Sequence, residues 1–203
     1  VEVIVPKKIQ CCGSLNHHLG KQDLAHKDFI NNINIWYDEY LRGNLDAILS
    51  NTSGCGTTLK DYEFIFRNDK ELNKKAKKIS ELTKDISEYL LENLNLKIQK
   101  KEKKYRIAYH SACSMQHGQK VHTQPIELLS KTKNDIMEIP EGHICCGSAG
   151  TYNILQSDIA KKLLEDKVKN IESLNPQIIS TGNIGCITQI SNGTNIPILH
   201  TVE

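Results

Sequence analysis

The sequence lacks the features that mark several large protein classes. No apolar run approaches the roughly 20 consecutive residues that a membrane-spanning helix requires. Excess charge is lacking too: 26 basic residues against 24 acidic ones leave a net charge of +2, which gives no argument for a nucleic-acid partner. No Gly-x-Gly-x-x-Gly run follows an expected strand and no P-loop is present, so a bound nucleotide or flavin is not expected.

The N-terminus also lacks a signal-peptide pattern. The chain begins Val1-Glu2-Val3-Ile4-Val5, without a basic region and without an initiating Met. We therefore expect a fragment of a longer protein with a cytoplasmic location, where attachment to the inner face of a membrane would come only through a complex.

Seven cysteines are the most informative residues that are present. An odd number argues against a closed disulfide framework, and cytosolic thiols usually serve metals or redox chemistry. Four of the cysteines form two Cys-Cys-Gly turns, at residues 11–13 and 145–147, and each of the others lies in its own glycine- or serine-flanked turn: Cys55, Cys113 and Cys186. This distribution predicts a metal or cluster site.

Between the cysteine turns, apolar patterns of strand and helix type alternate. Such alternation is typical of an α/β fold with mainly parallel sheets flanked by helices. Strands are expected at residues 1–5, 45–49, 106–110, 135–139 and 177–180. Helices are expected at residues 23–41, from about 57, at 71–94, around 125–129 and at 157–174, where Ile159, Leu163, Leu164, Val168 and Ile171 would face inward.

The spacing of the cysteines predicts an internal duplication. A proline stands five residues before each doublet (11 − 6 and 145 − 140), and a later cysteine follows the doublet by 43 residues in one half (55 − 12) and by 40 in the other (186 − 146). We expect two similar lobes related by a pseudo-twofold axis: a first domain at 1–96, a linker at 97–104 and a second domain at 105–203. The first domain would be truncated, because the counterpart of Cys113 falls before Val1.

The second domain holds the complete cysteine set. Each member follows an expected strand, and the carboxyl ends of parallel strands meet at one edge of a sheet, so the four thiols are expected to converge there. Four thiolates suit an iron–sulfur cluster or tetrahedral zinc, and Gly147 would supply the backbone twist that aims neighbouring cysteines into one space. The predicted ligands are Cys113, Cys145, Cys146 and Cys186 in the second domain, and the incomplete set Cys11, Cys12 and Cys55 in the first.

Other interpretations of these residues remain open. The cysteines could be buried structural thiols, a structural zinc site or a catalytic disulfide. His110 and His117 flank Cys113 and could hydrogen-bond a cluster or replace a ligand; His17 and His18 could line the corresponding pocket of the first domain. The ordinary alternative for all four histidines is a polar residue at a sheet edge.

Four motifs make the chain similar to a known family. They resemble the C-terminal half of the glycolate oxidase iron-sulfur subunit, and they are Tyr109-His110-Ser111-Ala112-Cys113, His117-Gly118-Gln119, the run Cys-Cys-Gly-Ser-Ala-Gly-Thr-Tyr-Asn at 145–153, and Thr181-Gly182-Asn183-Ile184-Gly185-Cys186. That family carries two cysteine-rich CCG domains, shared with heterodisulfide reductase and with proteins of lactate and anaerobic glycerol-3-phosphate oxidation. The likeness extends over essentially the whole chain.

The resemblance implies an electron-transfer subunit with a [4Fe-4S]-type cluster. Its partner would be an FAD-containing subunit that oxidises glycolate to glyoxylate, and its acceptor would be a quinone or similar carrier. Complete members carry an upstream ferredoxin-like domain with two [4Fe-4S] clusters; no Cys-x-x-Cys-x-x-Cys run of that kind occurs here. Oxidation of glycolate itself would take place in the FAD-containing subunit, so the fragment alone would be non-catalytic.

One departure from the wider family limits which properties of that family can be expected of this chain. The heterodisulfide reductase motif ends in Cys-x-x-Cys, but Asn183 stands at the first of these positions in the second copy and Thr52 in the first. We therefore expect a four-thiolate site in the second domain. The first domain has only Cys11, Cys12 and Cys55, so its site is expected to be metal-deficient or disordered. The alternatives are a heterodisulfide-reductase-like thiol–disulfide subunit and a zinc-stabilised docking module, in which zinc would occupy one lobe.

Overall fold

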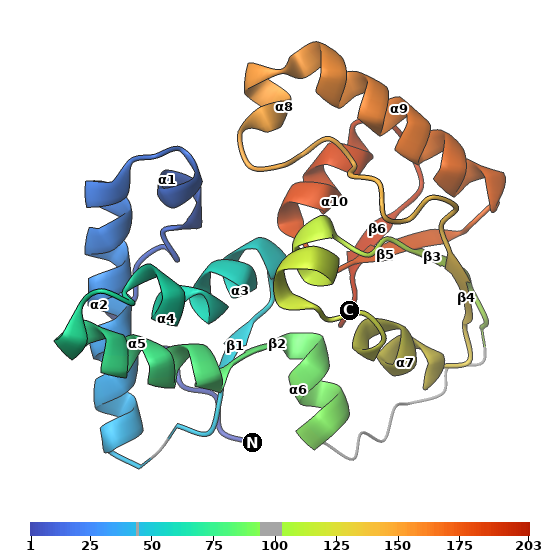
Figure 1. Ribbon diagram of the computed structural model, residues 1–203. Coiled ribbons are helices and arrows are strands. Elements are labelled where there is room, and N and C mark those ends of the chain that lie inside the picture. Colours follow the sequence, from blue (N-terminus) through green and yellow to red (C-terminus); the bar gives the residue numbers. More distant parts are fainter. Residues whose placement is uncertain (44, 94–102) are drawn as a thin grey trace. The chain divides into compact units, whose positions relative to one another are not determined.

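The computed structural model describes residues 1–43, 45–93 and 103–203 (Figure 1). They divide into two compact units: the first comprises residues 1–50 and 54–84, and the second comprises residues 51–53 and 85–203. Helices surround a two-stranded sheet and a four-stranded parallel sheet, so the predicted α/β class is confirmed. Most of the expected linker at 97–104 lies outside the described residues.

The first unit is mainly helical. Its elements are α1 (Ser14–His18), α2 (Gln22–Leu41), β1 (Ile48–Ser50), α3 (Ser53–Lys60), α4 (Tyr62–Ile65), α5 (Lys70–Leu82) and β2 (Thr83–Asp85), with α3 and β2 each shared at one end with the second unit. The predicted helix at 23–41 is confirmed as α2. Its apolar face packs Phe29 and Ile33 into a core with Tyr62 and Ile79, all four of them fully buried.

The second unit contains the four-stranded sheet, in the order β4-β3-β5-β6 with every neighbouring pair parallel. Its elements are α6 (Ile86–Asn93), β3 (Arg106–Tyr109), the π-helix η1 (Ser114–Gln119), α7 (Gln124–Ser130), β4 (Asp135–Glu138), α8 (Tyr152–Leu155), α9 (Ser157–Ser173), β5 (Ile178–Thr181), α10 (Ile184–Ser191) and β6 (Ile198–His200). The expected strands at 106–110, 135–139 and 177–180 are thus present within a residue or two.

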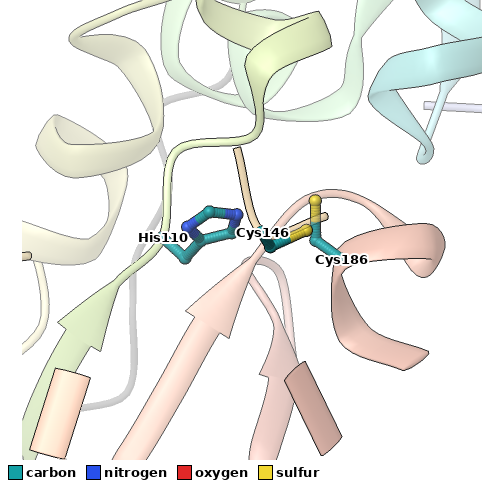
Figure 2. A group of neighbouring side chains, drawn as sticks. All are labelled: His110, Cys146 and Cys186. Carbon is teal, nitrogen blue, oxygen red and sulfur yellow. The ribbon is translucent and has the colours of Figure 1, made fainter. Parts of the chain in front are cut away.

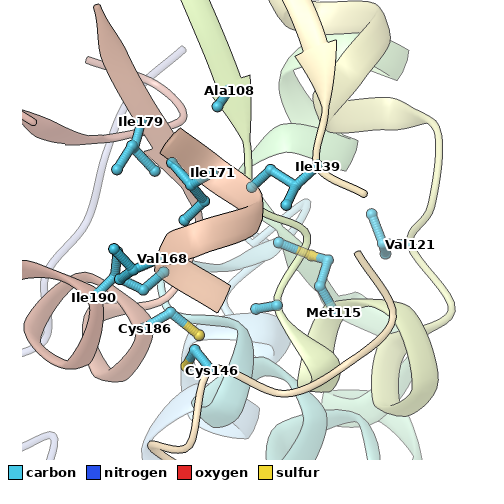
Figure 3. Close-up of a cluster of buried hydrophobic side chains, with 11 residues drawn as sticks. Ala108, Met115, Val121, Ile139, Cys146, Val168, Ile171, Ile179, Cys186 and Ile190 are labelled. Atoms are coloured by element: carbon cyan, nitrogen blue, oxygen red, sulfur yellow. The ribbon is translucent and has the colours of Figure 1, made fainter. Parts of the chain in front are cut away.

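The core of this unit joins the sheet to its helices (Figure 3). Val168 and Ile171 of α9 and Ile190 of α10 pack around Ile179 of β5. Two cysteines, Cys146 and Cys186, belong to the same buried cluster. The hydrophobic core therefore extends directly to the thiols at the sheet edge.

Three predictions about the elements are wrong. Residues 1–5 form no strand, and their side chains are mostly exposed; Val1, Val3 and Val5 expose 83%, 78% and 82%. The helix expected at 71–94 is interrupted by β2, which pairs with β1. Ile159, expected to face inward, is half-exposed at 50%, because the inward face of α9 runs through Ala160, Lys167, Val168 and Ile171.

None of the helices in the described ranges is long and apolar enough to cross a membrane.

Candidate metal centre

Three buried side chains with metal-binding atoms lie at one edge of the four-stranded sheet, where its parallel strands end. His110 directly follows β3, and its backbone N–H donates to Ser180 O in β5 over 2.8 Å. Cys186 lies in the first turn of α10, just beyond β5, and Cys146 lies in the loop between β4 and α8. Figure 2 shows these three side chains next to one another just beyond the strand ends. The sheet edge thus brings together residues 36 to 76 positions apart (146 − 110, 186 − 146 and 186 − 110).

The geometry of this group suits a bound cation. The ligand atoms of His110, Cys146 and Cys186 all lie within 4.8 Å of one another, and the residues expose 1%, 1% and 7%. Cys145 contacts Cys146 on one side and Cys113 on the other, although neither Cys145 nor Cys113 belongs to the 4.8 Å group. The four predicted ligands of the second unit therefore form one continuous series of sulfur contacts that ends at His110.

Contacts within this series lower the pKa values of two of the thiols and raise those of the other two. Cys113, and then Cys146, lower the pKa of Cys145 to about 2 by hydrogen bonding to its sulfur. Cys146 lowers the pKa of Cys186 to about 6 in the same way, with His110 acting in the same direction and burial opposing it. The pKa values of Cys113 and Cys146 are raised, because each holds its proton against a neighbouring thiolate. Two thiolates thus lie beside two thiols whose protons a bound metal would displace.

Gly147 makes the turn of the second doublet possible. Its φ is +92°, a conformation that side chains disfavour, and a Cβ atom here would lie 2.4 Å from Ala160 O in α9. Its N–H donates to Cys145 Sγ over 3.3 Å. The first doublet repeats this arrangement, since Gly13 has a φ of +77° and a Cβ there would lie 2.4 Å from the Phe29 ring. Each glycine lets its doublet lie directly against a helix.

A buried lysine near the thiols was not predicted from the sequence. Lys167 of α9 exposes 1%, and its Nζ donates to Glu141 O over 3.1 Å. Burial lowers the pKa of its ammonium group, while the charges of all four second-unit cysteines oppose that shift. The helical pattern contained the signal, because Lys167 stands four residues from Leu163 and four from Ile171 on the inward face of α9.

Asn183, the departure from the Cys-x-x-Cys form, has a structural role. Its Oδ1 accepts from the N–H groups of Gly185 and Cys186 over 2.8 and 3.2 Å, which caps α10. Its Nδ2 donates to Ser53 Oγ over 2.8 Å and to Ser114 Oγ over 3.3 Å. The side chain is therefore engaged in holding the turn that carries Cys186.

In the first unit, the cysteines form a smaller group. The Sγ atoms of Cys12 and Cys55 lie 3.0 Å apart, and this contact lowers the pKa of Cys55 and raises that of Cys12. Cys11 contacts Cys12 but is exposed. The described residues contain one compact group of three or more metal-binding side chains, and that group is the one in the second unit.

Two buried polar residues hold the first doublet, and the sequence analysis missed both. Asn32 donates to Cys11 O over 2.9 Å and to Gln10 O over 3.3 Å, and the Tyr62 hydroxyl donates to Cys12 O over 3.1 Å. Both residues lie within helices on otherwise apolar faces, so the available signal was a polar atom at an inward position.

The remaining candidate histidines lie outside both groups. His117 lies in η1 and is exposed. His17 is half-buried, with Nδ1 3.2 Å from Gln22 Oε1 and its ring against Phe29, and His18 is exposed. Of the four candidate histidines, the described structure brings only His110 to the cysteines.

Comparison with known proteins agrees with this arrangement of cysteines. Residues 1–60 and 107–191 match the model of the cysteine-rich domain family CCG, and each segment contains one doublet. The chain is 33% identical over 207 residues to the "Glycolate oxidase iron-sulfur subunit" of Escherichia coli (strain K12), covering 100% of this chain and 49% of that protein. It is 28% identical over 197 residues to the "Probable glycolate oxidase iron-sulfur subunit" of Bacillus subtilis (strain 168), covering 95% and 43%.

A second group of relatives carries a different name. The chain is 24% identical over 208 residues to "Lactate utilization protein A" of Geobacillus sp. (strain WCH70), covering 100% of this chain and 85% of that protein. The chain spans about half the length of the two glycolate oxidase subunits. Because the family model covers more than half of its residues, in two segments that each hold a Cys-Cys-Gly turn, the chain belongs to the CCG cysteine-rich domain family.

Proposed function

We propose that this chain is the cysteine-rich part of an iron–sulfur electron-transfer subunit. It would receive electrons from an FAD-containing subunit that oxidises glycolate to glyoxylate and pass them to an acceptor such as quinone. The observation that carries the proposal is the series of four thiols at the sheet edge of the second unit, a donor set that suits an iron–sulfur cluster. The 33% identity to a glycolate oxidase iron-sulfur subunit, across the whole chain, favours glycolate over a related 2-hydroxy acid.

The residues of the second unit fit such a group. Cys113, Cys145, Cys146 and Cys186 would hold a [4Fe-4S]-type cluster, which supplies one-electron storage when bound. Burial of Cys146 and Cys186 keeps water away from the sulfurs, and Gly147 N–H donates to Cys145 Sγ. Hydrogen bonds to ligand sulfurs and limited solvent access both set the reduction potential of such a centre.

Lys167 is expected to raise that potential. Adding an electron makes the site more negative, and a fixed buried cation stabilises the added charge. We expect Lys167→Met to lower the midpoint potential, measured by redox titration under EPR. Lys169→Met, which removes an exposed charge from the same helix, is the control and should leave the potential nearly unchanged. Equal potentials in wild-type protein and Lys167→Met would exclude this role for Lys167.

The first unit supports a second candidate function. Its sulfurs Cys12 Sγ and Cys55 Sγ lie 3.0 Å apart with unequal pKa values, which favours either thiol–disulfide chemistry of the heterodisulfide reductase kind or a zinc ion that stabilises a docking module. A closed zinc site needs a fourth ligand beyond Cys11, Cys12 and Cys55. Metal deficiency therefore remains our proposal for this set.

The proposal extends to the organisation of the protein. We propose two CCG domains at 1–96 and 105–203 joined by a linker at 97–104, an upstream ferredoxin-like domain in the complete subunit, and a cytoplasmic location with the complex at the inner face of the membrane. The two segments matched by the family model, one in each proposed domain, support the duplication.

Anaerobic purification with metal analysis tests the proposed function. We expect iron and acid-labile sulfide in the protein, an EPR signal after reduction, and co-purification with the flavoprotein when both are expressed together. Stoichiometric zinc without iron would refute electron transfer through these domains and favour the docking module. Loss of two free thiols on mild oxidation, reversed by a dithiol, would favour the thiol–disulfide alternative if no iron is found.

A further inference from the structure

His110 is a buried imidazole for which no nitrogen or oxygen atom in the described part of the chain serves as a hydrogen-bond partner at either ring nitrogen, and the side chain that interacts with its ring is the Cys186 thiol. The residue exposes only 1%. A polar group in a protein interior costs free energy unless a hydrogen bond or a metal satisfies it. Its position is nevertheless fixed, because its backbone N–H is bonded to Ser180 O at the end of the sheet. An ordered but unsatisfied imidazole indicates that a ligand completes the site.

The direction in which the ring faces identifies the kind of ligand. Figure 2 shows one ring nitrogen of His110 turned toward the sulfurs of Cys146 and Cys186. A metal with bonds of about 2.3 Å to sulfur and about 2.0 Å to nitrogen separates its donor atoms by roughly 3.5–4 Å in tetrahedral geometry. The three donor atoms here lie within 4.8 Å of one another, so small side-chain rotations bring all three to one metal.

We propose that His110 supplies a nitrogen ligand, in addition to the four cysteine sulfurs, to the metal centre that Cys146 and Cys186 bind. This inference rests on the proposed function and adds a ligand to it, because it assumes that the same sulfurs bind iron. The residue at the additional cysteine position of the heterodisulfide reductase motif is not free to take this role, because Asn183 caps α10 and bonds to Ser53 and Ser114. The centre thus has a mixed sulfur and nitrogen ligand set.

A nitrogen ligand changes the charge of the centre. A neutral imidazole adds no negative charge, whereas a thiolate at the same position adds one. Where histidines replace cysteines on one iron of a two-iron cluster, the reduction potential is much higher. We therefore expect His110→Cys to lower the midpoint potential relative to the wild-type protein.

Isotope labelling tests the bond directly. The chain is produced with ¹⁵N-histidine, purified anaerobically and reduced, and pulsed EPR measures the nitrogen coupling to the metal centre. We expect a strong coupling, typical of a directly bonded imidazole, in wild-type protein. It should disappear in His110→Ala and persist in His122→Ala, which removes an exposed histidine of the same unit. The wild-type protein alone shows that a histidine is bonded, so the assignment to His110 needs a variant. If His110→Ala folds poorly, loss of the coupling in His110→Cys, which keeps a metal-binding side chain at this position, gives the same assignment.

The outcomes separate this inference from the proposed function. An iron signal with only the weak coupling of a hydrogen-bonded histidine, or a strong coupling that survives in His110→Ala, overturns the ligand role and leaves electron transfer standing. If the protein contains zinc and no iron, the proposed function fails, and cobalt exchanged for the zinc reports the same labelled nitrogen. A strong coupling in the cobalt form that is lost in His110→Ala supports His110 as a ligand, and its absence in wild-type protein overturns that role. Protein that binds neither metal refutes both.

Discussion

Replacing Cys146 with serine is expected to reduce the metal bound in the second unit to background. Cys146 exposes 1% and contacts both Cys145 and Cys186, so it stands in the middle of the sulfur series. A serine hydroxyl is a harder and far less acidic donor than a thiol, and iron–sulfur and zinc sites prefer thiolate. Iron and sulfide analysis with EPR of the reduced variant measures the loss, and glycolate-dependent electron transfer should fall with it in the complete complex.

The matched control is Cys55→Ser, the same exchange at a half-buried cysteine of the first unit. It should leave the second-unit signal intact. Thermal unfolding of both variants and wild-type protein in their metal-free forms separates loss of ligand from loss of fold, because none of them then carries the stability that a bound metal adds. A normal cluster signal in a folded Cys146→Ser protein would show that Cys146 is not a ligand.

Gly147→Ala is expected to destabilise the second unit severely. A left-handed backbone costs a side-chain residue about 1–2 kcal/mol. The new Cβ would also meet the carbonyl of Ala160 at 2.4 Å, and that contact is with helix backbone, which cannot rotate away. Forcing such a contact typically adds about 1–3 kcal/mol. The sum is a large part of a domain stability of roughly 5–15 kcal/mol, and chemical denaturation of metal-free protein measures it.

Gly20→Ala measures the loss of stability that comes from the left-handed backbone conformation alone. Gly20 has a φ of +74°, and a Cβ there would find nothing within 4 Å. This variant should lose only the backbone contribution, about 1 kcal/mol, from the stability of the first unit. A loss at Gly147→Ala no greater than that at Gly20→Ala would mean that the doublet does not need to lie so close to α9.

The convergence of the second-unit cysteines could be anticipated because it depends on a simple rule. Strands β3 and β5 each contain consecutive apolar residues, Ile107-Ala108-Tyr109 and Ile178-Ile179, and alternating helices make the strands parallel, so residues just after them share one edge. His110 and Cys186 both follow such strand ends. Strand pattern and topology together were therefore enough to place the edge.

The interruption between α5 and α6 could not be found from periodicity. Apolar residues continue at helical spacing from Leu72 to Leu90, so the pattern has no break. Pairing of β2 with β1 takes residues 83–85 out of the helix, and such pairing depends on a distant segment. A local signal did exist: Asp85 accepts from Ser87 N–H and Glu88 accepts from Asp85 N–H, the reciprocal bonds of a capping box at the start of α6.

Residues 1–5 are apolar but mostly exposed, whereas Lys167 is charged but buried, so composition alone gives the wrong burial for both. The first are apolar and β-branched, yet an apolar run makes a strand only where another strand pairs with it. Lys167 is charged, yet a carbonyl acceptor and nearby cysteines make its burial tolerable. Both outcomes depend on tertiary partners that local composition does not specify.

The short segment at residues 51–53 lies between stretches of the first unit but belongs to the second. It therefore limits where the gene could be divided without removing part of a unit. Although residues of the first unit flank it, Ser53 N–H donates to Gly182 O over 3.1 Å, Gln119 Nε2 donates to Ser53 O over 3.0 Å, and His200 Nε2 lies 2.8 Å from Asn51 O. A gene fragment that began after residue 84 would encode nearly all of the second unit but none of these contacts. Part of the second unit is thus encoded within the first. Transferring the second unit to another protein without the first would therefore leave an incomplete fold.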